Sequence, residues 1–206
     1  CIVGEPTNPN KLGEMIKIGR RGSLSGNIEI FGTQGHIAYP HLSNNPINTL
    51  VSICKKLKEK KLDGGSKSFQ PSNLEFTSIN VDNKAHNVIP ARARAQFNIR
   101  YNNLHTANSL KKKILSLVKK ITNKNNCKFK INFMANGESF LTKPNKTIFL
   151  MKKIIKKNTR ISPKLSTSGG TSDARFIRKI APCLEFGLVN KTMHRVDECV
   201  SLTDLK

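Results

Sequence analysis

Tryptophan is absent from this 206-residue chain, tyrosine occurs twice, and 13 acidic residues stand against 36 lysines and arginines. A formal charge of +23 is enough to attract nucleic acid or an anionic membrane. However, no aromatic residues stand among the lysine clusters, which fall on the polar faces of predicted helices at Lys55–Lys58, Lys111–Lys113 and Lys152–Lys153. We therefore expect solvated helix faces, with neither a nucleic-acid nor a membrane partner.

Long apolar runs and paired cysteines are also missing. No apolar segment is long enough to span a membrane, and no signal peptide opens the chain. The chain begins at Cys1 inside an apolar run, without an initiator methionine, which predicts a truncated start. The five cysteines are odd in number and include no C-x-x-C pair, so we expect reduced thiols in a cytoplasmic protein.

The first half of the chain predicts a strand, a helix and a second strand. Ser23–Phe31 alternates apolar and polar residues, which is typical of a half-buried strand. Pro46 opens an amphipathic helix that runs toward Leu62, where Asp63–Gly65 stops it. Leu74–Val81 is predicted to form the next strand.

The middle of the chain carries the most regular alternation. Ile89–Tyr101 places apolar residues on one face and mainly arginine and amide side chains on the other, which predicts one long strand. Leu110–Ile121 predicts a helix, and Cys127–Phe133 a further strand. From Ser23 to Met134 the order is therefore β-α-β-β-α-β, the ferredoxin-like arrangement of a four-stranded antiparallel sheet with two helices on one face.

Different patterns flank this unit, and they indicate an interrupted α/β domain. Residues 1–21 contribute a short apolar strand and a turn. Residues 136–206 are expected to hold a helix, a glycine-rich loop, a strand and the start of a last helix: Asn145–Lys157, Ser168–Asp173, Cys183–Gly187 and Ser201–Asp204. We predict that the ferredoxin-like unit, residues 22–135, is inserted into this domain.

Three groups of residues could bind a ligand or have only a structural role. The loop Gly32–His41 holds two histidines and a tyrosine, and it is either a functional loop or a solvated one. The loop Ser168–Asp173 could present backbone N–H groups to an anion, or Asp173 could simply cap the next helix. Arg20, Arg21 and Arg100 are candidate carboxylate clamps or ordinary surface arginines.

Glu5 and His194, near opposite ends of the chain, each look like one ligand of a metal site. A catalytic zinc needs three protein ligands and an open position, and no complete set lies between them. The histidines of residues 36–105 fall in or beside the inserted unit. The chain is therefore expected to be the C-terminal part of a metalloenzyme that lacks its first ligands.

Several motifs occur in one order that resembles the succinyl-diaminopimelate desuccinylases, di-zinc amidohydrolases of the aminoacylase/carboxypeptidase superfamily. They are Gly4–Thr7, Gly19–Ser23, Gly35–His41, His86–Pro90, Phe97–Arg100, Ser168–Asp173 and the segment around His194. The resemblance covers essentially the whole chain. It implies an α/β fold in which a partial zinc-hydrolase catalytic domain, residues 1–21 and 136–206, is interrupted by a lid and dimerisation domain.

The resemblance also implies roles for individual residues. Glu5 would be a terminal ligand of one zinc, and His194 a ligand of the other. His36 would reach the active site of the other subunit of a homodimer and stabilise the oxyanion, a contribution of about 2.7–4 kcal/mol. The residues expected to bind the substrate N-succinyl-LL-2,6-diaminopimelate are Arg20, Ser23, Tyr39, Asn87, Arg100, Gly170 and Thr171.

Two departures from the family pattern limit these implications. The His-x-Asp ligand motif, the bridging Asp and the Glu-Glu pair that supplies the general base are missing, so this chain alone is expected to be inactive. His86 stands where relatives often carry Asn or Thr, and it would serve as a spacer before Asn87. Cobalt or manganese could replace zinc on such ligands.

Two other functions remain open at this point. An acetylornithine deacetylase-like enzyme would differ in its acyl pocket, because the succinyl group carries an extra carboxylate that Arg20 and Arg100 would favour. A non-catalytic dimerisation module would leave Glu5 and His194 far apart.

Overall fold

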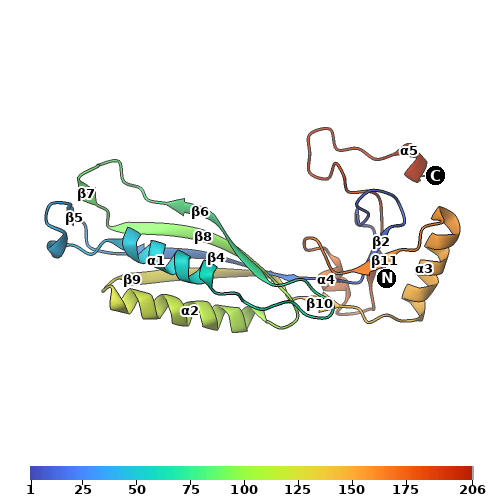
Figure 1. Cartoon of the computed structure of the whole chain (residues 1–206), viewed down its shortest axis with the longest axis horizontal. Coiled ribbons are helices and arrows are strands. Elements are labelled where there is room, and N and C mark those ends of the chain that lie inside the picture. Colours follow the sequence, from blue (N-terminus) through green and yellow to red (C-terminus); the bar gives the residue numbers. More distant parts are fainter. Residues whose placement is uncertain (206) are drawn as a thin grey trace. The chain divides into compact units, whose positions relative to one another are not determined.

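The computed structural model describes residues 1–205, which divide into two compact units. Unit 1 comprises residues 1–21, the short segment Ser66–Gln70 and the chain from Ser139 onward. Unit 2 comprises Gly22–Gly65 and Pro71–Glu138. Each unit combines helices with sheet, which confirms the predicted α/β class (Figure 1).

Unit 2 is built on the predicted β-α-β-β-α-β order. Its strands and helices are β4 (Gly22–Phe31), α1 (Pro46–Glu59), β6 (Asn73–Asn80), β8 (Arg92–Tyr101), α2 (Ala107–Lys124) and β9 (Lys128–Gly137). The strand order in the sheet is β6-β8-β4-β9, and every neighbouring pair is antiparallel. Both helices contact the sheet and each other, as Figure 1 shows.

A single apolar core holds unit 2 together. The inward residues of the strands pack against one face of each helix, and the most buried include Leu24, Ile53, Phe97 and Leu110. Both helices begin at capped ends, since the Asn45 side chain accepts the Ile47 N–H at 2.9 Å and Thr106 forms a capping box with Ser109. The local sequence and the tertiary packing therefore favour the same structure.

Proline divides the long alternation that was predicted as one strand. Val88–Ile89 forms a separate strand, β7, which pairs with β5 (Gly35–His36), and β8 begins only at Arg92. Pro90 has no N–H with which to continue a ladder, so the prediction of an unbroken strand was wrong at this point. A short 3₁₀ helix, η1 (Pro40–Leu42), follows β5.

Helix α1 ends at Glu59, earlier than predicted, and the chain is then anchored by Asp63. One carboxylate oxygen of Asp63 accepts the Asn102 side-chain N–H at 2.6 Å and the Gly65 backbone N–H at 2.7 Å. The other oxygen lies 3.0 Å from Nε2 of His105. Burial acts to raise the pKa of Asp63, but hydrogen bonds from Ser72, Gly65 and Asn102 outweigh it and lower the pKa to about 2.

Unit 1 has a smaller and more mixed sheet. Its strands are β1 (Ile2–Val3), β12 (Leu184–Glu185), β2 (Met15–Lys17) and β11 (Lys164–Ser166), in that spatial order, and a separate pair joins β3 (Gly19–Arg20) to β10 (Phe140–Leu141). The β1–β12 and β11–β2 pairs are parallel, whereas β12 and β2 are antiparallel. The helices are α3 (Lys146–Thr159), α4 (Ala174–Ile177) and α5 (Leu202–Leu205).

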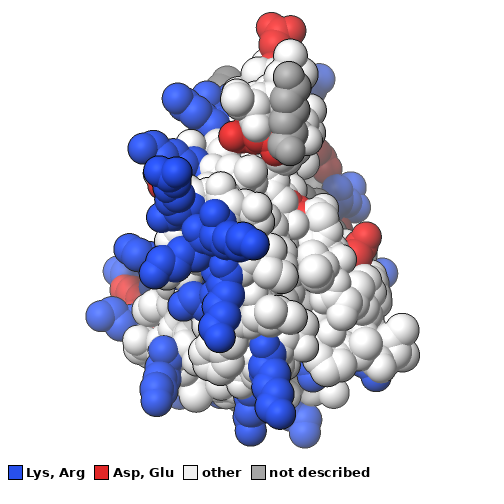
Figure 2. Space-filling view, turned by 90° about the vertical axis from the view of Figure 1, so that its right-hand side faces the viewer, with Lys and Arg blue, Asp and Glu red and all other residues white. Residues whose placement is uncertain are grey.

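Two small apolar clusters support this sheet. Ile148 and Ile155 of α3 pack against Ile16 and Leu184, and a second cluster gathers around Phe140. Helix α3 carries its lysines on the outside, and Figure 2 shows lysine and arginine side chains forming a band with few acidic neighbours on the face drawn. In the part of the chain that the structure describes, no helix has both the length and the apolarity needed to cross a membrane.

Candidate functional site

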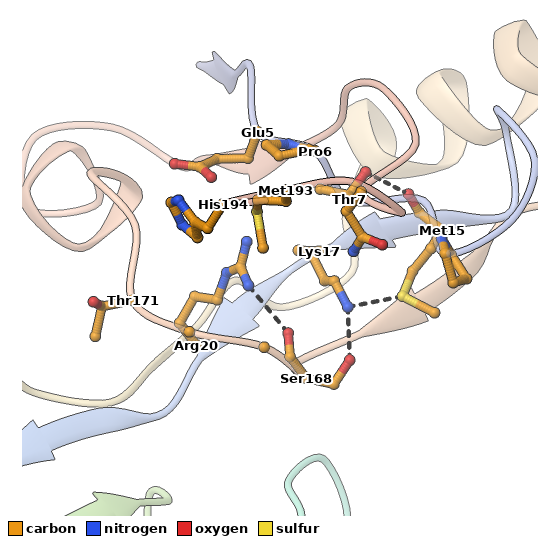
Figure 3. Close-up of a pocket in the computed structure, with 14 residues that line it drawn as sticks. Glu5, Pro6, Thr7, Met15, Lys17, Arg20, Ser168, Thr171, Met193 and His194 are labelled. Atoms are coloured by element: carbon orange, nitrogen blue, oxygen red, sulfur yellow. Dashed lines mark hydrogen bonds between the residues drawn. The ribbon is translucent and has the colours of Figure 1, made fainter. Parts of the chain in front are cut away.

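A pocket of about 300 Å³ lies within unit 1. Its lining comes from the segment after β1, from β2 and β3, from the glycine-rich loop after β11, and from the loop near His194 (Figure 3). The lining residues are Glu5, Pro6, Thr7, Pro9, Met15, Lys17, Arg20, Ser168, Gly169, Gly170, Thr171, Asn190, Met193 and His194. Five residues singled out from the sequence are among them.

The two candidate metal ligands, Glu5 and His194, both line this pocket. Gly187 lets β12 approach the Glu5 backbone closely, because a Cβ at that position would lie 2.5 Å from the Glu5 carbonyl oxygen. His194 has a left-handed backbone with φ of 61°, and its N–H donates to the Glu198 carboxylate at 3.2 Å. Burial raises the pKa of Glu5, as do the nearby carboxylates of Glu185 and Asp173, while Arg20 opposes the rise.

The glycine-rich loop brings Gly170 and Thr171 to the pocket. Gly169 has φ of 104°, and a Cβ there would lie 2.3 Å from Arg20 Nη1, so only glycine lets the loop pass over this arginine. Asp173 occupies the position before α4 but makes no capping hydrogen bond with its side chain. The simple helix-cap interpretation of this loop is therefore not what the structure shows.

Arg20 lines the pocket with its guanidinium already bound on one side. Its Nε donates to Glu185 Oε2 at 2.8 Å, its Nη2 also donates to that oxygen, and its Nη1 donates to the Ser168 carbonyl at 3.2 Å. Arg20 is only 7% exposed and Glu185 only 1%. The guanidinium N–H groups of Arg20 that make none of these hydrogen bonds are the ones available to a ligand in the pocket.

Lys17 was not identified from the sequence. Its ammonium donates to Ser168 Oγ at 2.6 Å, Met15 Sδ at 2.8 Å and Ser166 Oγ at 3.4 Å (Figure 3). Burial and, to a smaller extent, the nearby Arg20 charge lower the pKa of Lys17 to about 8, while Glu185 acts in the opposite direction. A lysine between two isoleucines, Ile16 and Ile18, was the signal that could have revealed it.

The predicted residues His36, Tyr39 and Asn87 come together in unit 2. The N–H of Ile37 donates to the Asn87 carbonyl at 3.0 Å, and the ring centroids of His36 and Tyr39 lie 6.0 Å apart. The Ala38 N–H donates to Nδ1 of His36 at 3.1 Å. The rings of His36 and Tyr39 are exposed, so this loop offers them to a partner or ligand.

Ser23 and Arg100 face each other across β4 and β8. Ser23 is buried, and its hydroxyl accepts the Asn98 side-chain N–H at 3.1 Å. Among the described residues, none accepts a hydrogen bond from Arg100 Nη1, which is buried. His105 is bound to Asp63 and has a structural role, and the exposed His86 lies in the loop before β7.

Residues 1–205 contain no group of three or more His, Cys, Asp and Glu side chains arranged to hold a metal ion. Glu5 and His194 nevertheless supply one carboxylate and one imidazole to the same pocket. Both donor types suit zinc or cobalt, so the residues present fit a partial ligand set.

Comparisons with known proteins agree with this fold. The family model described as the peptidase dimerisation domain matches residues 18–126. The succinyl-diaminopimelate desuccinylase of Pelagibacter ubique (strain HTCC1062) is 63% identical over 206 residues, which are 100% of this chain and 54% of that protein. The enzyme of the same name from Methylobacterium radiotolerans is 49% identical, and this chain covers 53% of its length. The chain thus spans about half the length of the curated relatives it matches.

Solved structures share the fold at low sequence identity. A putative aminohydrolase from methicillin-resistant Staphylococcus aureus superposes with a TM-score of 0.77 at 15% identity, over 99% of this chain and 53% of that chain. A tripeptidase from Staphylococcus aureus superposes with a TM-score of 0.76 at 16% identity, over 91% of this chain and 48% of that chain. The domain model covers just over half of the residues, and on that basis the chain belongs to the peptidase dimerisation domain family.

Proposed function

We propose that this chain forms part of a metal-dependent amidohydrolase that cleaves N-succinyl-LL-2,6-diaminopimelate to succinate and LL-diaminopimelate, on the route to lysine and peptidoglycan. The names of the curated relatives support the reaction. The observation that carries the proposal is the pocket of unit 1, which is lined by Glu5 and His194 together with Arg20. A non-catalytic dimerisation module would have no reason to gather these residues.

Glu5 and His194 would each hold one of two zinc ions, with cobalt as an alternative. Bound metal would polarise the scissile carbonyl and make a water molecule nucleophilic near neutral pH. The chain's own contribution is to hold the Glu5 carboxylate and the His194 imidazole on one wall of the pocket. The general base and the bridging ligand are not among the residues of this pocket and would come from outside this chain.

Substrate binding would use the cationic side of the same pocket. Arg20 presents its remaining N–H groups, and Gly170 and Thr171 present backbone or hydroxyl groups, to a carboxylate or the amide of the substrate. In unit 2, we propose Ser23, Tyr39, Asn87 and Arg100 as further substrate-binding residues. His36 would donate to the oxyanion in the active site of a second copy, and unit 2 would serve as the lid and dimerisation domain of a cytoplasmic homodimer.

A chimera tests this proposal. The part of the Pelagibacter ubique relative that this chain does not cover is joined to this chain, and succinate release is measured with zinc present. We expect hydrolysis of N-succinyl-LL-2,6-diaminopimelate in preference to N-acetyl-L-ornithine, because the succinyl group carries a free carboxylate that the acetyl group lacks. The 206-residue chain alone should show no turnover.

Matched variants locate the activity. Glu5→Gln and His194→Gln should each reduce turnover by more than about 100-fold, since each removes a metal ligand. Glu14→Gln is the control, because Glu14 accepts the backbone N–H groups of Asn10 and Lys11 and is not among the residues that line the pocket. A folded chimera that is inactive, or equally active with Glu5→Gln, would show the proposal to be wrong.

A further inference from the structure

Glu185 is a buried carboxylate that none of the proposed catalytic steps uses. It lies on β12, is 1% exposed, and receives hydrogen bonds on both of its oxygens. Oε2 accepts Nε and Nη2 of Arg20, and Oε1 accepts the hydroxyl of Ser172. Burying an ion pair gives little net stability, so its retention here calls for another explanation.

The contacts of Arg20 supply that explanation. Glu185 holds the Nε and Nη2 groups, while the third nitrogen, Nη1, donates to the Ser168 carbonyl at 3.2 Å. The guanidinium plane is therefore fixed from two directions, by β12 and by the glycine-rich loop. Gly169 packs on the same guanidinium with no room for a Cβ, so the arginine and the loop hold each other in place.

Two cations, Lys17 and Arg20, lie in the wall of the pocket. Glu185 is paired in register with Lys17 on β2, and it bonds Arg20 on β3, so one carboxylate faces two cations. The Lys17 ammonium donates to three neutral acceptors, which belong to Met15, Ser166 and Ser168. Lys17 and Arg20 both line the pocket, so its wall carries two cations that would attract a carboxylate of the ligand.

We propose that Glu185, with Ser172 holding its second oxygen, is a positioning residue that orients Arg20 and the glycine-rich loop for binding a substrate carboxylate. The proposal rests on the proposed function for its ligand class, a dicarboxylate. It separates two roles: Arg20 touches the ligand, whereas Glu185 acts only through Arg20. Because the Arg20 guanidinium is already oriented before the ligand binds, less side-chain conformational entropy is lost on binding.

The first experiment tests the contact without any ligand. In the 206-residue chain, the Nε–H signal of Arg20 is assigned by its loss in Arg20→Lys and followed by NMR hydrogen exchange. We expect slow exchange in the parent chain and at least tenfold faster exchange in Glu185→Gln. Glu29→Gln is the matched control, because Glu29 accepts Arg94 Nε at 2.7 Å in unit 2. Unchanged Arg20 exchange in Glu185→Gln would overturn the proposal.

The second experiment tests the consequence for binding, with succinate as the probe in calorimetric titrations. We expect Glu185→Gln to weaken succinate binding about tenfold and Glu29→Gln to leave it unchanged. Arg20→Ala should lose binding and regain it with millimolar ethylguanidinium, but only while Glu185 is present. Rescue that is equally good in the Arg20→Ala/Glu185→Gln double variant would contradict a positioning role.

The outcomes separate this inference from the proposed function. If Arg20 exchange depends on Glu185 but the parent chain binds no succinate, the positioning role stands and the proposed substrate is wrong. If succinate binds equally well to Glu185→Gln, the positioning role is wrong whatever the substrate. Should Glu185→Gln fail to fold, Ser172→Ala removes only a hydroxyl and is expected to give a smaller loss in the same direction. No change in folded Ser172→Ala then overturns the proposal.

Discussion

The two units bury different kinds of side chain. Unit 2 buries one continuous set of apolar residues between its sheet and two helices. Unit 1 has only two small apolar clusters, and it buries Lys17, Arg20 and Glu185 beside its pocket. Apolar burial is the dominant favourable term in folding, whereas buried charges are retained for specificity or chemistry. We therefore expect unit 2 to contribute most of the stability, whereas the buried charges of unit 1 lie at the pocket that we propose as the active site.

The largest expected effect concerns the core of unit 2. Leu110→Ala removes a fully buried side chain on α2, so unfolding free energy should fall by about 2–5 kcal/mol. Leu115→Ala on the same helix is the control, because Leu115 is 38% exposed and its loss should be well under half as large. Urea denaturation measures both. Equal losses would contradict the assignment of stability to this core.

Asp63→Asn should give the next largest loss, and the loss should depend on pH. The folded pKa of about 2 lies below the unfolded value of 3.8, so the unfolded state binds more protons between these values. The stabilisation, roughly 2 kcal/mol, is present above pH 4 and disappears as the pH falls through 2. Denaturation of the parent chain and the variant at pH 7 and pH 2 measures this difference. In the control Asp82→Asn, where the side chain is exposed, the difference in unfolding free energy between variant and parent chain should be the same at pH 7 and pH 2.

Lys17→Met should stabilise unit 1 at neutral pH, by about 1–2 kcal/mol, because it removes a buried cation. The folded pKa of about 8 lies below the ordinary 10.5, so the parent chain gains stability as the pH rises between these values. The advantage of the variant should therefore shrink by pH 10. Lys11→Met, at an exposed lysine, is the control. A constant difference across this range would argue against the burial of a charged lysine.

The smallest effect compares helix caps in the two units. Asn145→Ala removes the side-chain oxygen that accepts the Ile148 N–H at 3.1 Å at the start of α3, and Thr106→Ala removes the corresponding cap of α2. Each of these two substitutions should lower the free energy of unfolding by about 1 kcal/mol. Thermal melts followed by circular dichroism suffice. Asn158→Ala near the end of α3 should matter less, and a larger effect there would contradict the cap assignment.

Local periodicity was enough to predict most of unit 2, because its strands and helices are each specified by nearby residues. The exception was the break at Pro90, where one missing N–H outweighs a continuing alternation. Glu5 and His194 were identified through motifs. Lys17 and Glu185 were missed because their burial arises when β2 pairs with β12, which are distant in sequence. Nothing in the sequence marks Ser66–Gln70 as part of unit 1, where the Ser68 carbonyl accepts the hydroxyl of Thr167.

The pairing of β1 with β12 has a consequence for synthesis on the ribosome. The amino group of Cys1 donates to the carbonyl of Pro182, and the two residues are 181 positions apart. At about 5–20 residues per second, β1 waits roughly 10–40 s for its partner strand to be made. Unit 2 lies almost entirely between them and can fold during that interval. The apolar residues of β1 and β2 lack their partner strands throughout it, so we expect this stretch of the nascent chain to be a site where a chaperone binds.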